Sequence, residues 1–128
     1  PRSTLFPYTT LFRSATVGVD PAIMGIGPIP ATRKALARAG LSVADLDVVE
    51  INEAFSSQAL ACIRDLGLDP ATVNLDGGGL SIGHPLGATG ARITGKAASL
   101  LARENGRYAL ATQCIGGGQG IATILERV

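Results

Sequence analysis

The sequence lacks tryptophan, and its aromatic residues are only three phenylalanines and two tyrosines. We therefore expect an aliphatic core of Ala, Ile, Leu and Val, which suits closely packed α/β layers. Neither sign of charge dominates, because the chain has 11 basic and 10 acidic residues and a formal net charge of +1. No basic stripe with interleaved aromatic residues is present, so the sequence gives nucleic-acid binding little support. At 128 residues the chain has the length of about one domain.

Long apolar runs and cysteines are also scarce. Charges or glycines interrupt each apolar stretch before it reaches about 18 residues, so we predict no transmembrane helix and no membrane partner. The two cysteines, Cys62 and Cys114, are too few for a disulfide scaffold, and nothing indicates a bridge between them. Cys62 lies in an amphipathic helical pattern, where we expect it only to pack. This cysteine usage favours a reducing, cytoplasmic location.

Residues 1–14 differ in pattern from the rest of the chain. They have neither helical nor strand periodicity, and they lack the basic start and cleavage site of a secretory signal. Residues 4–14 match the conceptual translation of a common DNA-sequencing adapter. We therefore predict that 1–14 is non-native and disordered, and that the natural domain spans 15–128 as part of a longer protein. The alternative is a disordered natural tail.

Short β-rich runs alternate with amphipathic helical patterns after residue 14. This alternation predicts an α/β layered domain, a mixed sheet with helices. We expect Asn52 to cap the second helix, and Gly40 and Gly67 to end the first two helices. The last two strands should form an antiparallel hairpin around Cys114. Strands are expected at 15–20, 47–51, 73–75, 108–112 and 120–125, helices at 29–39, 52–66 and about 85–103, a loop at 21–28 and a capped turn at 42–45.

The one histidine, His84, and the later cysteine, Cys114, each lie among glycines. Glycine lets the backbone come close to a ligand and exposes N–H groups that can stabilise a developing negative charge. Imidazole and thiol are the side chains most easily tuned to exchange protons near neutral pH. The pattern indicates acid–base or nucleophilic chemistry on a carbonyl compound, and we predict no metal.

Three blocks give the chain a family resemblance: Asn52-Glu53-Ala54-Phe55, Gly83-His84-Pro85 and Cys114-Ile115-Gly116. In this order and spacing they resemble the carboxy-terminal half of thiolases (acetyl-CoA acyltransferases), and the resemblance extends from about residue 15 to 128. It implies the second half of a five-layer αβαβα fold. It also implies a reversible Claisen reaction, in which 3-ketoacyl-CoA and CoA exchange with a shortened acyl-CoA and acetyl-CoA. Coenzyme A is then a substrate, and no cofactor is expected.

The resemblance gives Cys114 and His84 the central roles. Cys114 matches a catalytic cysteine that protonates the acetyl-CoA enolate and later deprotonates the incoming CoA thiol. His84 matches the histidine that takes the proton of the nucleophile and then helps to bind the enolate oxygen. The alternatives are an inert buried cysteine and a structural histidine.

Four further residues have roles implied by the same resemblance. Asn52 matches a residue that holds a water in the enolate oxyanion site, and Gly116 one whose N–H forms a second oxyanion site. Glu53 would support the surroundings of this oxyanion site through hydrogen bonds, and Met24 would line the pantetheine channel. The competing interpretations are a helix cap for Asn52, a solvated helix face for Glu53 and core packing for Met24.

The resemblance also indicates what the chain does not contain. The nucleophilic cysteine and the adenine-binding loop of thiolases lie in the first half of the fold, so we expect this chain to be inactive alone. The parent protein would be a homodimer or homotetramer, and the context of Cys114 resembles degradative (β-oxidation) thiolases. The alternative function is a non-catalytic CoA-binding or subunit-interaction module. A sterol-carrier-type thiolase is a related alternative, and a ketoacyl synthase is disfavoured because Cys114 stands where its second histidine is usual.

Overall fold

A computed structural model of the chain describes residues 9–128, which form a four-stranded mixed sheet in the order β1-β4-β3-β2. The strands are β1 (Thr9–Gly18), β2 (Val48–Ile51), β3 (Tyr108–Ile115) and β4 (Gln119–Arg127). β4 pairs antiparallel with both β1 and β3, whereas β2 runs parallel to β3. The carboxyl ends of β2 and β3 therefore meet at one edge of the sheet.

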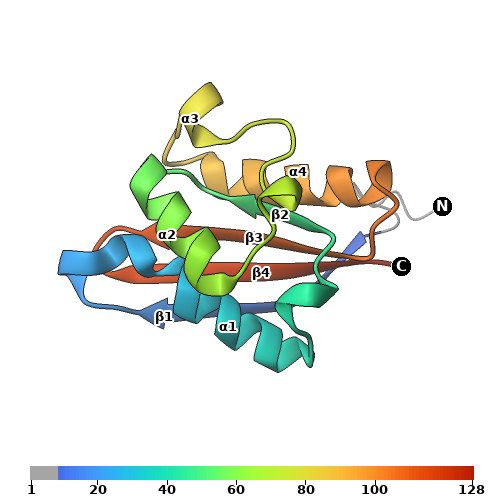
Figure 1. Cartoon of the computed structure of the whole chain (residues 1–128), viewed down its shortest axis with the longest axis horizontal. Coiled ribbons are helices and arrows are strands. Elements are labelled where there is room, and N and C mark those ends of the chain that lie inside the picture. The colour runs from blue at the N-terminus through green and yellow to red at the C-terminus, as the bar shows by residue number, and fades with distance from the viewer. Residues whose placement is uncertain (1–8) are drawn as a thin grey trace.

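Helices cover both faces of this sheet. The α-helices are α1 (Pro28–Ala39), α2 (Ser56–Leu66), α3 (Gly79–Ile82) and α4 (Thr89–Arg103), and the short 3-10 helices are η1 (Pro21–Ile26), η2 (Val43–Asp45) and η3 (Pro70–Thr72). One face packs against α1 and α2 and the other against α4 (Figure 1). Both layers are aliphatic, as the shortage of aromatic residues predicts. The expected α/β class with a mixed sheet is confirmed.

Alternate residues of β2 point into the two layers. Val49 and Ile51 join the core under α1 and α2, whereas Val48 joins the core under α4. The same alternation places Glu50 on the α4 face. The chain thus buries an acidic residue on a strand that is otherwise aliphatic.

Several local predictions are confirmed. α1 ends at Gly40 and α2 at Gly67, both with left-handed backbone. Ser42 and Asp45 form the reciprocal hydrogen bonds of a capping box around η2. β3 and β4 form the expected hairpin, but each is longer than predicted, and the segment predicted as a loop at 21–28 contains η1.

Two predicted helix starts are wrong. Asn52 does not cap α2, because its N–H donates to the carbonyl of Thr112 and prolongs the sheet, and the helix begins only at Ser56. α4 begins at Thr89 rather than near Pro85, because His84 to Ala88 form a turn in which the N–H of Ala88 donates to the carbonyl of Pro85. Residues 52–55 and 83–88 are therefore not helical, and both segments lie at the same edge of the sheet.

The prediction that residues 1–14 are disordered is wrong for 9–14. These residues form the first half of β1, which pairs with β4 through a register shift between Leu11 and Arg13. Backbone hydrogen bonds need no particular side chain, so the open edge of β4 accepts this segment. Residues 1–8 lie outside the described part of the chain. The non-native origin of 1–14 stays a prediction.

A close approach of two glycines fixes η1 against the sheet. A Cβ atom at Gly120 of β4 would overlap the carbonyl of Gly27, which lies just before α1. Only a residue without a side chain allows this contact. It brings Met24 of η1 toward the end of β3. Within residues 9–128, no helix is long and apolar enough to span a membrane.

Candidate active site

A cavity of about 260 Å³ lies at the carboxyl ends of β2 and β3. This is the edge at which α/β sheets usually bind ligands. The cavity is lined by residues from η1, from the segment after β2, from the turn before α4 and from the end of β3: Met24, Ala54, His84, Leu86, Gln113, Cys114, Ile115 and Gly116. Four of the predicted site residues, namely Met24, His84, Cys114 and Gly116, thus share one cavity. Their chemical roles stay predictions.

His84 is held from both sides of its ring. Nδ1 lies 2.7 Å from the hydroxyl oxygen of Thr89, and Nε2 lies 3.4 Å from the amide nitrogen of Asn52. The guanidinium of Arg92 donates to the carbonyl of Gly83 at 2.7 Å and anchors the turn to α4. The imidazole therefore has a fixed direction, although the residue is exposed at the mouth of the cavity.

Asn52 is the fifth predicted residue that the structure brings to the site. It is fully buried at the end of β2, and its Oδ1 has no hydrogen-bond partner among residues 9–128. A buried amide oxygen without a partner is costly. A hydrogen-bond donor such as a water would satisfy this oxygen, while the amide nitrogen of the same side chain faces His84.

Glu53 holds the glycine-rich loop that precedes His84. Its carboxylate accepts hydrogen bonds from the side chain of Asn74 and from the N–H of Leu80, each at 3.0 Å. A Cβ atom at Gly78 would lie 2.6 Å from this carboxylate, so the contact needs glycine. Glu53 therefore does not lie on a solvated helix face, which corrects that alternative. These hydrogen bonds go to Asn74 and Leu80 and not to Asn52, so the predicted supporting role of Glu53 stays a prediction.

Cys114 lies near the end of β3, half-buried and without a disulfide. Burial raises the pKa of its thiol, while its own backbone N–H lowers it to a smaller extent. The direction is opposite to the stabilised anion that the neighbouring glycines suggested. Within this chain the thiol is suited to donate a proton.

Gly116 opens the hairpin turn after Cys114. A Cβ atom built at this glycine would meet no atom within 4 Å among the described residues. The space above its backbone is therefore open to a ligand. By contrast, Gly118 in the same turn packs against the chain that leads into η1.

Sequence reasoning missed Thr89, Asn74 and Gln113. The Oδ1 of Asn74 accepts from the N–H of Ile51, and its Nδ2 donates to the carbonyl of Ile51, so this side chain extends the edge of β2. A hydroxyl residue five positions after His84 was a usable signal for Thr89. The contacts of Asn74 and Gln113 depend on strand neighbours that local patterns do not specify.

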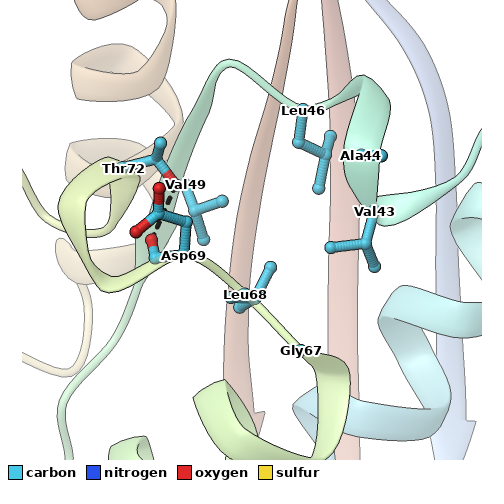
Figure 2. Close-up of a pocket in the computed structure, with 8 residues that line it drawn as sticks. All are labelled: Val43, Ala44, Leu46, Val49, Gly67, Leu68, Asp69 and Thr72. Atoms are coloured by element: carbon cyan, nitrogen blue, oxygen red, sulfur yellow. Dashed lines mark hydrogen bonds between the residues drawn. The ribbon is translucent and has the colours of Figure 1, made fainter.

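A larger cavity of about 430 Å³ lies between η2 and the turn after α2 (Figure 2). Its walls are mainly aliphatic, and its polar groups are engaged in the local turn. Thr72 donates to the carbonyl of Asp69, and the carboxylate of Asp69 accepts from the N–H of Ala71. None of the predicted site residues lines it, so we place the chemistry at the smaller cavity.

The buried Cys62 lies outside both cavities. Its thiol donates to the carbonyl of Gly25 at 3.5 Å, and burial raises its pKa to about 11. A thiol with this pKa stays protonated at neutral pH, which agrees with the expected packing role.

Comparison with known proteins gives the same family throughout. The family described as "Thiolase, C-terminal domain" matches residues 5–127. Beta-ketothiolase BktB of Cupriavidus necator is 61% identical over 127 residues, which cover 99% of this chain and 32% of that protein. The 3-oxoadipyl-CoA/3-oxo-5,6-dehydrosuberyl-CoA thiolase of Escherichia coli K12 is 57% identical over 126 residues, 97% of this chain and 31% of that protein.

Solved structures agree with these sequence relatives. Human mitochondrial 3-ketoacyl-CoA thiolase superimposes with a TM-score of 0.92 at 49% identity, over 94% of this chain and 30% of that one. The acetyl-CoA acetyltransferase of Bacillus anthracis gives a TM-score of 0.93 at 45% identity, over 95% and 31%. The chain thus spans about a third of the length of the relatives it matches. It belongs to the thiolase family, in which it corresponds to the C-terminal domain.

Proposed function

We propose that this chain supplies the acid–base part of a thiolase active site, which cleaves 3-ketoacyl-CoA with coenzyme A. The observation that carries the proposal is the shared cavity of His84 and Cys114, with Met24 and Gly116 in its walls. The relatives named for 3-ketoacyl-CoA and related CoA thioesters support this substrate class.

The proposed reaction starts at a nucleophilic cysteine that thiolases carry outside the region matched here. Nε2 of His84 accepts the proton of that thiol, and the sulfur bonds to C3 of the 3-ketoacyl-CoA. The C2–C3 bond then breaks and its electron pair moves to C2, which gives the enolate of acetyl-CoA. His84 and a water held by Asn52 stabilise the enolate oxygen.

Cys114 completes both half-reactions in this scheme. Its thiol gives a proton to C2, which releases acetyl-CoA and leaves a thiolate. That thiolate takes the proton of the incoming CoA, whose sulfur attacks the acyl group. The nucleophilic cysteine leaves as a thiolate and takes its proton back from His84. The N–H of Gly116 stabilises the thioester oxygen during this attack. A thiol and an imidazole carry every proton, so we propose no cofactor.

The test is a chimera in which this chain replaces the matching third of the Cupriavidus beta-ketothiolase. We expect it to catalyse thiolysis of a 3-ketoacyl-CoA. Cys114→Ala should lower kcat by about 10²- to 10⁴-fold, because general acid–base catalysis contributes that much. Cys62→Ala is the matched control and should keep the parent rate. A folded chimera that is inactive, or one in which Cys114→Ala is as fast as the control, contradicts the proposal.

We also propose an oligomeric state, a cellular location and a reaction direction for the parent enzyme. A homodimeric or homotetrameric thiolase of the cytoplasm, acting in the degradative direction, fits the sequence context of Cys114. The oligomeric state follows from sedimentation of the chimera. The ratio of its thiolysis and condensation rates tests the direction.

A further inference from the structure

Thr89 is the residue in direct contact with the inner nitrogen of His84. It is fully buried at the start of α4. Its hydroxyl oxygen lies 2.7 Å from Nδ1 of His84 and 3.1 Å from the carbonyl oxygen of Pro85. A hydroxyl has one hydrogen, and a carbonyl can only accept. The hydroxyl therefore donates to Pro85 and accepts from an N–H at Nδ1.

The other ring nitrogen gives the same result from a separate contact. Nε2 of His84 lies 3.4 Å from Nδ2 of Asn52, an amide nitrogen that can only donate. With the Asn52 amide in this orientation, Nε2 carries the lone pair. The two contacts on opposite sides of the ring thus favour the same tautomer, with the hydrogen on Nδ1.

We propose that Thr89 is a positioning residue that holds His84 in the Nδ1–H form, so that Nε2 is the nitrogen that accepts the proton. The catalytic meaning of this inference rests on the proposed function, whereas the tautomer rests on the two contacts alone. The partner of the second nitrogen of a functional histidine ordinarily sets which nitrogen is free to react. Thr89 has a fixed position because α4 packs against the sheet.

The tautomer can be read directly in the chain of 128 residues, because His84 is its only histidine. We would record long-range ¹H–¹⁵N correlations of the ring at about pH 9, well above the usual titration range of imidazole. A protonated Nδ1 and an unprotonated Nε2 are expected. A protonated Nε2, or the averaged pattern of a free imidazole, overturns the proposal.

Substitutions at Thr89 separate the effect of its hydroxyl on the tautomer of His84 from the effect of side-chain shape. Thr89→Val keeps the shape of the side chain and removes the acceptor, so it should shift the population toward the Nε2–H form. Thr89→Ser should retain the Nδ1–H form. Thr94→Val is the matched control, since the Thr94 hydroxyl also donates one turn back along α4, to Gly90 at 2.8 Å. If Thr89→Val leaves the ring signals as they are in the control, the proposal is wrong.

The kinetic consequence is measured in the chimera with the Cupriavidus relative. Thr89→Val should lower kcat by at least about tenfold with little change in KM, as expected when the partner of a reacting group is lost. Thr89→Ser should restore the rate. Equal kcat values for Thr89→Val and Thr94→Val contradict the proposal. An inactive parent chimera defeats the proposed function instead, and the ring signals then decide the inference about Thr89 on their own.

Discussion

Glu50 provides a quantitative test of how this domain is built. It is 3% exposed on the α4 face of β2, and its Oε1 has no hydrogen-bond partner among residues 9–128. Burial raises its pKa from 4.5 to about 7. The charges of Lys96 and Arg92 oppose this shift, while those of Asp76 and Glu53 reinforce it to a smaller extent.

The raised pKa has a definite cost in stability. Below about pH 4.5 the carboxyl is neutral in both the folded and the unfolded chain, so its burial carries no ionisation penalty. Between pH 4.5 and about 7 the unfolded chain ionises first, and the free energy of unfolding falls as the pH rises. Above that range the loss levels off. One pH unit corresponds to about 1.4 kcal/mol, so the total loss is about 1–3 kcal/mol after some relaxation of the site.

Glu50→Gln keeps the shape of the side chain and removes its titration. We expect urea denaturation to give this variant a higher unfolding free energy than the parent at about pH 8, by about 1–3 kcal/mol, and a smaller advantage at about pH 5. Glu104→Gln, at an exposed position after α4, is the control and should keep the pH profile of the parent. An equal loss of stability between pH 5 and 8 in Glu50→Gln and in the parent would show that Glu50 is not the group responsible.

Two further changes test how the loops around the site are held. Gly120→Ala should destabilise the domain by about 1–3 kcal/mol in urea denaturation, because its Cβ overlaps backbone, whereas Gly87→Ala meets no atom within 4 Å and should cost far less. Equal costs would refute the close approach. Glu53→Ala leaves the N–H of Leu80 and one of the two amide hydrogens of Asn74 without an acceptor, so it should cost about 1–3 kcal/mol and increase hydrogen exchange at Leu80. Unchanged exchange at Leu80 would show that this carboxylate does not hold the loop.

The parts of the fold that depend on local chemistry could be predicted from the sequence. Gly40 and Gly67 end helices because the left-handed backbone at a C-cap favours glycine. The hairpin around Cys114 follows from two β-rich runs separated by glycines.

The errors arise where tertiary contacts override local preference. Asn52 has the residue type of a helix cap, but parallel pairing of β2 with β3 engages its backbone, and local patterns do not specify that pairing. The turn after His84 delays α4 for a similar reason, because Thr89 and Arg92 hold it from the helix. Residues 9–14 lack strand periodicity, yet they extend β1 along an open strand edge.

The residues of the candidate site also fall into those that local motifs identify and those that depend on tertiary contacts. The resemblance identified His84, Cys114 and Asn52 from their motifs, and the sheet topology brings these segments to one edge. Thr89 and Asn74 act through side-chain contacts with His84 and Ile51, which depend on three-dimensional placement. Motif matching therefore finds the reactive groups more readily than the residues that orient them.

In the proposed reaction, the cavity of His84 and Cys114 moves a proton at C2 of acetyl-CoA. This proton transfer can be measured as exchange of the acetyl-CoA methyl hydrogens with D₂O, catalysed by the chimera and followed by NMR or mass spectrometry. We predict that the parent chimera and Cys62→Ala exchange these hydrogens at equal rates, and that Cys114→Ala is slower by at least about 10²-fold. Exchange by Cys114→Ala at the parent rate would contradict the account.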